Sequence, residues 1–188
     1  RNIVALTDLG ESMPKREAWG GIGTDRNPSN DVNSEYSTIV TQYGDARIIE
    51  QTATQLDAIP DFVGGIDYEK LEKARKLSTS EYSINEALGY ISLKSTLQTD
   101  QVLAVAFEYT YGGRTYQVGE FASDVTDVNK ALFVKSLKNT SNNPQQGNWP
   151  LMMKNVYYLA STVEKEKFRL DVKFQSDTAG VYLNYLPE

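Results

Sequence analysis

The sequence predicts an α+β protein in which strands outnumber helices. Short apolar or alternating runs recur over Ser80–Leu137, and Gly112-Gly113 joins two of them. This pair is a hairpin signal, because glycine readily adopts the positive φ that tight turns need. Apolar residues at helical spacing occur over Glu35–Ile59. We therefore expect a small helical α/β module at residues 1–66 and an antiparallel β-sandwich-like module, prealbumin- or immunoglobulin-like, at residues 67–188.

Within the first module, the apolar run Ile3–Leu6 predicts a buried strand. The Gly-, Pro-, Asn- and Asp-rich stretch Gly10–Ser34 predicts a long loop. Two helices are expected next, separated by Gly44, with Asp45 as the N-cap of the second and Pro60 as its stop. Their apolar stripes are Tyr36, Ile39, Val40 and Tyr43, then Ile48, Ile49, Thr52, Leu56 and Ile59.

The second module should begin with a short amphipathic turn capped by Asp67. We predict that Val102–Phe107, which is apolar on both pleat faces, is covered on both sides. Pro150 at a helix-start position favours a helix over Trp149–Leu159. Lys167–Gln175 is the clearest strand, because apolar and polar residues alternate along it. The other expected strands are Ser80–Asn85, Tyr90–Ser95, Gln101–Tyr109, Arg114–Phe121 and Ala131–Leu137.

Composition excludes several function classes. The net charge is −6, from 19 basic and 25 acidic residues, and Lys and Arg form no run, so nucleic acid is not an expected partner. Cysteine is absent, which excludes disulfides, thiolate metal sites and cysteine nucleophiles. Histidine is also absent, which removes the usual general base near pH 7 and the commonest metal ligand. We expect a protein that is not an enzyme and needs no cofactor or metal.

The oxygen-rich loop is the one candidate for calcium. Five side chains alternate at the spacing of a calcium-loop ligand set: Asp25, Asn27, Ser29, Asp31 and Asn33. The match then fails, because Asn30 replaces the sharp-turn glycine and Tyr36 stands where the bidentate Glu belongs. The favoured interpretation is a turn-rich loop whose side-chain oxygens bond nearby backbone. In the same loop, Gly20–Gly23 lacks the spacing of a phosphate-binding motif.

Other candidate sites carry little signal. The carboxylates Glu11, Asp57, Asp61, Glu120 and Asp124 show no spacing that selects a catalytic pair. Tyrosines favour binding surfaces, yet half-buried strand tyrosines are the commoner explanation for Tyr109, Tyr111 and Tyr116, and for Tyr157, Tyr158, Tyr182 and Tyr185. Asn139–Ser141 fits the N-glycosylation pattern, a short match to which we give no weight.

Neither end of the sequence has the features of a complete chain. No run of the sequence approaches the roughly 18 apolar residues of a membrane helix. At the start, Arg1 stands where an initiator Met would, and no signal-peptide layout follows it. At the other end, the sequence stops abruptly at Leu186–Glu188. We therefore expect a fragment of a longer protein.

Seven segments in order along nearly the whole chain resemble one protein family: Arg1–Glu11, Asp67–Leu77, Leu88–Leu93, Val102–Tyr109, Tyr116–Phe121, Leu151–Val156 and Asn184–Glu188. They are similar to the SprA/Sov family, giant outer-membrane proteins of Bacteroidetes required for gliding motility and type IX secretion. Gly10–Ser34 and Lys138–Asn148 match least.

The resemblance implies that the parent is the type IX secretion translocon and that the chain has no catalytic residues. Charged residues around the strands and the two helical stripes favour a soluble extramembrane domain. We expect it on the cell-surface side, with the periplasmic side as the alternative. Its expected partners are other domains of the parent, partner secretion subunits and secreted cargo proteins. The alternative is a cell-surface adhesion module that binds carbohydrate or calcium.

Overall fold

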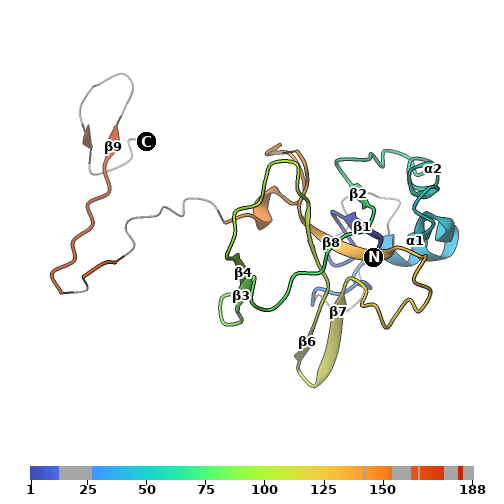
Figure 1. The fold of residues 1–188 in the computed structure, drawn as a ribbon, viewed down its shortest axis with the longest axis horizontal. Helices are drawn as coiled ribbons and strands as arrows, with labels where there is room; N and C mark the ends of the chain where they lie inside the picture. The colour runs from blue at the N-terminus through green and yellow to red at the C-terminus, as the bar shows by residue number, and fades with distance from the viewer. Residues whose placement is uncertain (13–26, 142, 154–161, 165, 176–181, 184–188) are drawn as a thin grey trace. The chain divides into compact units, whose positions relative to one another are not determined.

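The computed structural model describes residues 1–12, 27–141, 143–153, 162–164, 166–175 and 182–183. The chain forms two compact units, Arg1–Met153 and Lys154–Glu188. Together the described residues form a mixed α+β structure in which strands outnumber helices (Figure 1).

A four-stranded sheet is the centre of the first unit. It contains β1 (Ile3–Leu6), β2 (Tyr68–Leu71), β5 (Leu103–Val105) and β8 (Leu132–Lys138) in the order β2-β1-β8-β5. β1 runs antiparallel to β2 and parallel to β8, and β8 runs antiparallel to β5. Because β1 is central, both of its faces are buried, which explains why its sequence is apolar without alternation.

Three short helical elements cover one face of this sheet. They are α1 (Glu35–Gln42), η2 (Gly44–Arg47) and α2 (Thr52–Leu56). Their apolar stripe packs against Val4, Leu6 and Phe133, which point to this face by strand alternation. The resulting core has these buried members: Val4, Leu6, Leu9, Ile39, Ala46, Ile49, Leu56, Ile59, Phe62, Tyr68, Val118, Ala131 and Phe133.

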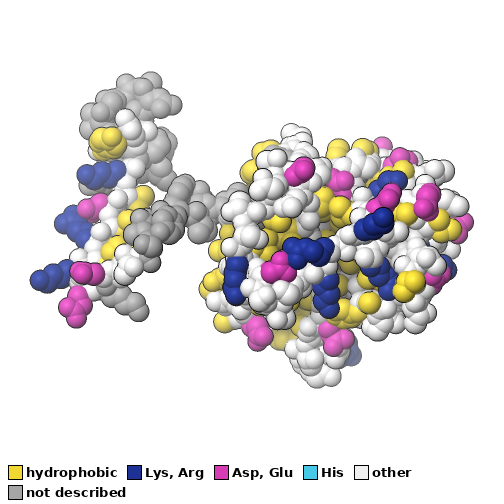
Figure 2. Space-filling model, viewed as in Figure 1, with side chains coloured by type: hydrophobic (Ala, Val, Ile, Leu, Met, Phe, Trp, Pro, Cys, Tyr) yellow, Lys and Arg dark blue, Asp and Glu magenta, His cyan; other side chains and the backbone are white. Residues whose placement is uncertain are grey.

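The opposite face of the sheet is covered much less completely. Only Ala5, Leu132 and Val134 are buried in its cluster. Six further apolar side chains pack there while staying partly exposed, and we call them the open face: Ile3, Leu71, Val102, Ala104, Ala106 and Val125. Figure 2 shows hydrophobic side chains at the surface over the area between β3–β4 and β8 in Figure 1.

Two hairpins complete the first unit. β3 (Tyr82–Asn85) pairs with β4 (Tyr90–Leu93), and β6 (Phe107–Tyr111) pairs with β7 (Arg114–Val118), both antiparallel. The second hairpin projects away from the four-stranded sheet (Figure 1). Gly112 and Gly113 form its turn with φ of 58° and 78°, which confirms the hairpin predicted from the glycine pair.

The second unit contains one described strand pair, β9 (Phe174–Gln175) with β10 (Tyr182–Leu183). The strand predicted over Lys167–Gln175 is therefore wrong for all but its last two residues. Trp149–Leu151 forms a 3₁₀ turn, labelled η3, instead of the start of an α-helix. The remainder of that predicted helix, from residue 154, lies outside the described residues.

Three further expectations need correction. Residues Tyr68–Leu71 form a strand and not a turn, because β1 offers them an open edge. The second helix is split into η2 and α2, and Asp45 lies inside η2 and does not cap a helix. Val102–Ala106 are only half-buried and Phe107 is 40% exposed, so this segment is not covered on both sides.

The compact units also differ from the predicted modules 1–66 and 67–188. β1 from the first module pairs on both sides with strands from the second, so a boundary at residue 66 would cut through the central sheet.

Candidate functional site

A buried polar network joins the helical layer to the sheet. Arg47, next to Ala46 of the core, donates to both carboxylate oxygens of Glu120 at 2.5 and 2.7 Å. The Tyr36 hydroxyl donates to Glu120 Oε1 at 2.7 Å, and the Phe133 backbone N–H donates to Oε2 at 2.8 Å. Burial, followed by the hydrogen bond to Glu120, raises the pKa of Tyr36. Every acceptor position that Glu120 offers is used for structure.

A second buried cluster lies where the chain leaves β1. Lys135 on β8 forms a 2.5 Å ion pair with Glu11 and donates to the Thr7 carbonyl. Asp8 accepts from Gly10 N–H at 2.8 Å, from the Ser12 hydroxyl at 2.8 Å and from Asn33 Nδ2 at 3.4 Å. Burial raises the pKa of Glu11, and Lys135 opposes that shift. The cluster anchors the chain after β1 to β8 and to the start of α1.

Asp8 and Lys135 in this cluster, like Arg47 in the first, are site residues that the sequence argument missed. Lys135 lies within β8 opposite Leu6, the last residue of β1, so the parallel pairing places it beside the segment that follows β1. To predict this contact one must know that β1 and β8, which are more than a hundred residues apart, pair with each other. The local periodicity of the sequence does not reveal that pairing. The arrangement provides one cation for two carboxylates, with the remaining oxygens held by backbone and amide donors.

The five carboxylates considered from sequence do not form a catalytic pair. Glu11 and Glu120 belong to the two separate clusters, whereas Asp57 accepts from the Tyr68 hydroxyl at 2.7 Å. Asp124 accepts from the Phe121 N–H at 2.8 Å, a bond that lowers its pKa. Asp61 is exposed, with φ of 59°.

The described part of the oxygen-rich loop directs its oxygens to backbone. Asn30 Oδ1 accepts from Gly119 N–H at 2.9 Å, and Asn33 Oδ1 accepts from Glu35 N–H at 2.8 Å. Ser29 Oγ accepts from Asp31 N–H at 3.3 Å. These acceptors serve different elements and do not converge on one point. Among the residues that the structure describes, no group of three or more acidic side chains could hold a metal ion. Asp25 and Gly20–Gly23 lie outside them.

Aromatic side chains form a ladder on the β6–β7 hairpin. Tyr109 stacks on Phe107 at a centroid distance of 6.2 Å and on Tyr116 at 5.2 Å. The hydroxyl of Tyr109 donates to the Pro28 carbonyl, and that of Tyr116 accepts from Asn27. Tyr109 thus stacks with two neighbouring rings, while a sugar needs a free ring face to stack on. The ladder mainly ties the hairpin to the loop.

The glycosylation-like asparagine is structural. Asn139 is 1% exposed, and its amide donates to the carbonyls of Gly65 and Ile66 while Ser136 donates to its oxygen. The folded protein does not present it to a modifying enzyme.

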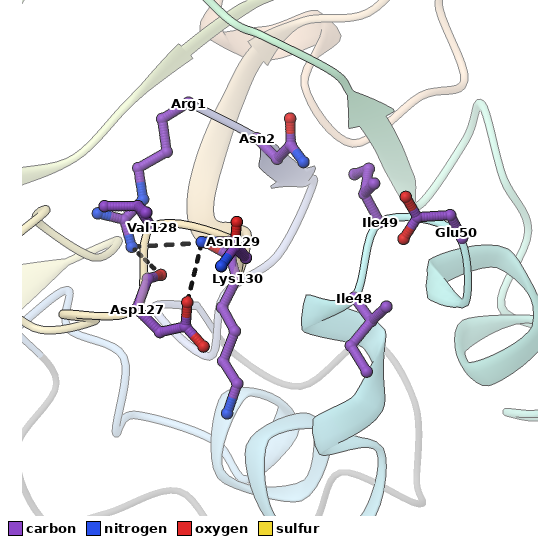
Figure 3. Close-up of a pocket in the computed structure, with 9 residues that line it drawn as sticks. All are labelled: Arg1, Asn2, Ile48, Ile49, Glu50, Asp127, Val128, Asn129 and Lys130. Atoms are coloured by element: carbon purple, nitrogen blue, oxygen red, sulfur yellow. Dashed lines mark hydrogen bonds between the residues drawn. The ribbon is translucent and has the colours of Figure 1, made fainter.

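An open cleft of about 430 Å³ lies at the start of β1 (Figure 3). The Arg1 guanidinium sits on one side, bound to the carbonyls of Val125 and Asp127. Ile48 and Ile49 line the opposite side. The charged side chains on its rim are of both signs, so the cleft has no distinct electrostatic preference.

No protein-family model matches the chain, and no curated protein matches it either. Within the described residues, no helix is both long enough and apolar enough to cross a membrane. The two polar clusters are buried, whereas the open face, the two hairpins and the cleft are accessible among the residues that the structure describes.

Proposed function

We propose that this chain is a non-enzymatic structural and interaction domain of a type IX secretion translocon, outside the membrane and on the cell-surface side. The open face is the observation that carries the proposal. Exposed apolar side chains that adjoin a core are the usual mark of a surface that packs against another protein. The sequence resemblance to the SprA/Sov family supplies the identity of the assembly.

The proposed role is packing and contact. One face of the four-stranded sheet is sealed by helices, while the other leaves six apolar side chains partly exposed. We propose that another domain of the parent, or a partner secretion subunit, provides the second layer over this face. That layer would complete the sandwich-like packing predicted from sequence.

A pair of matched substitutions in the encoding bacterium tests the proposal. Val102→Glu places a charge on the open face at a half-buried position, which the isolated domain should tolerate. Gln101→Glu, one residue away and exposed, adds the same charge beside that face. At equal protein levels, Val102→Glu should reduce both cargo secretion and cell spreading, and Gln101→Glu should change neither. Normal secretion and spreading in a folded Val102→Glu variant would overturn the proposal.

The membrane side has its own test. An epitope inserted between Gly112 and Gly113 should be tolerated, because both residues have open space around them. On intact cells the epitope should be cleaved by added protease. Protection until the outer membrane is permeabilised would place the domain in the periplasm.

The second candidate is a cell-surface adhesion module that binds carbohydrate or calcium. The observation in its favour is that Tyr109 and Tyr116 contact the oxygen-rich loop through Pro28 and Asn27. A glycan array with and without calcium separates the two functions. Binding that is lost in Phe107→Ala, a change at the exposed end of the ladder, would favour adhesion.

A further inference from the structure

The β3–β4 hairpin has one apolar and one polar face. Its register pairs Tyr82 with Leu93 and Ile84 with Ile91, so these four side chains share a face by strand alternation. Ser83 and Ser92 point to the other face. Ile84 is 57% exposed and Ile91 is 36% exposed, and Leu88 in the turn is 75% exposed. The apolar face is therefore formed but incompletely covered.

An isolated two-stranded hairpin is only marginally stable in water, and three or more strands with an apolar face, or packing against a helix, are needed for independent stability. In the part of the chain that the structure describes, neither strand pairs with a third. The Lys94 N–H donates to the Glu81 carbonyl at 2.9 Å, which makes Glu81 and Lys94 a hydrogen-bonded pair. The alternation of antiparallel pairing then directs the backbone groups of Tyr82 and Ile84 outward from β3.

The size of the apolar face indicates its partner. Its exposed area is on the order of a few hundred Å², in the range of functional patches on monomers. A stable dimer needs roughly 800 Å² from each partner, so a second copy of the chain does not fit by area. One added strand needs only an unpaired edge and a short apolar row.

We propose that the outer edge of β3 binds one extended peptide strand from another protein. The strand alternates apolar and polar side chains, continues the apolar row at Ile84, and has a basic residue beside the exposed carboxylate of Glu86. Main-chain hydrogen bonds to Tyr82 and Ile84 give affinity, and the apolar row gives register. This surface is separate from the open face, and the proposal holds whether or not the domain belongs to a translocon.

The test uses the full chain and an eight-residue peptide in which valine and threonine alternate between terminal lysines. Fluorescence anisotropy should show saturable binding below millimolar peptide, with slower amide exchange at Tyr82 and Ile84. A peptide N-methylated on its β3-facing edge keeps the side chains but loses those hydrogen bonds, and should bind about tenfold more weakly or worse. Ile84→Ser should weaken binding similarly, whereas Ser83→Ala on the polar face should not.

Three results would overturn the proposal. No binding at millimolar peptide would exclude strand addition. Equal binding of the N-methylated peptide would indicate apolar adsorption only. A dimer in sedimentation that Ile84→Ser dissociates would make a second copy the occupant. The peptide control does not depend on the folding of any variant.

Discussion

Arg47 holds both carboxylate oxygens of Glu120 and lies with its guanidinium carbon 4.3 Å from the centre of the Phe133 ring. One side chain thus joins the helical layer, the segment after β7 and the central strand β8. Glu120 is only 2% exposed. In the sequence, Glu120 was one of five carboxylates that no spacing distinguished, and the structure shows that it is buried and paired with Arg47.

Glu120→Gln should lower the free energy of unfolding by about 3 kcal/mol, because it leaves the buried Arg47 cation without a counter-charge. Urea denaturation of the purified chain measures the change. Glu81→Gln is the control: Glu81 also pairs with an arginine, Arg75, but at an exposed site, and its loss should barely alter unfolding. Equal effects of the two substitutions would show that the buried Arg47–Glu120 pair contributes no more to the free energy of unfolding than an exposed pair does.

Gly10→Ala should destabilise the fold by roughly 3 kcal/mol or more. Gly10 has φ of 89°, and a Cβ there would lie 2.5 Å from the Asn30 carbonyl oxygen, so strain and overlap add. Gly112→Ala is the control, because Gly112 has φ of 58° but no atom within 4 Å of an added Cβ. It introduces backbone strain without overlap and should lower the free energy of unfolding by about 1 kcal/mol. Thermal unfolding of both variants gives the comparison. A Gly10 variant no worse than the Gly112 variant would contradict the close approach of the loop.

Lys135→Met should be strongly destabilising near neutral pH, by about 3 to 5 kcal/mol, because Glu11 stays buried near Asp8 without its cation. Adding Glu11→Leu should recover much of the loss, since an apolar pair replaces two charges. Guanidinium denaturation of the single and double variants completes the cycle. A double variant as unstable as Lys135→Met would indicate that packing, and not charge, holds this end of β1.

The same pair predicts a pH dependence. Burial raises the folded-state pKa of Glu11 above 4.5, and removing Lys135 should raise it further. A carboxyl with a raised folded pKa favours folding below its unfolded pKa, and that advantage is lost as pH rises through the folded value. The deficit of Lys135→Met relative to the parent chain should therefore be smaller at pH 4 than at pH 7. A constant deficit would count against Glu11 as its source.

Glu81 should titrate with a pKa of about 2, lowered mainly by the Ser78 backbone N–H and then by Arg75. Its contribution to stability is small because the site is exposed to solvent; it is present above pH 4.5 and is lost as pH falls through about 2. In Arg75→Gln the pKa should rise but stay below 4.5, because the Ser78 donor remains. Carbon NMR of the Glu81 carboxyl during an acid titration reports both values. A complete return to 4.5 would assign the shift to Arg75 alone.

Local pattern determined the elements that depend on neighbours in sequence. The apolar run of β1, the stripe of α1 and the turn at Gly112-Gly113 were all predicted correctly. In each case the controlling property lies within a few residues: continuous burial, a period of 3.6, or glycine at positive φ.

Pairing between distant segments decided the rest. Tyr68–Leu71 became a strand because β1 was available beside it, and Glu120 became buried because Arg47 and Phe133 surround it. Lys135 met Glu11 only after β8 aligned with β1. The sequence by itself therefore determined which segments can be strands or helices, and what chemistry the missing His and Cys exclude. Tertiary structure alone decided which faces are covered and which charges are buried. The reason is that burial of a residue depends on which distant segment packs against it, and not only on its own local sequence.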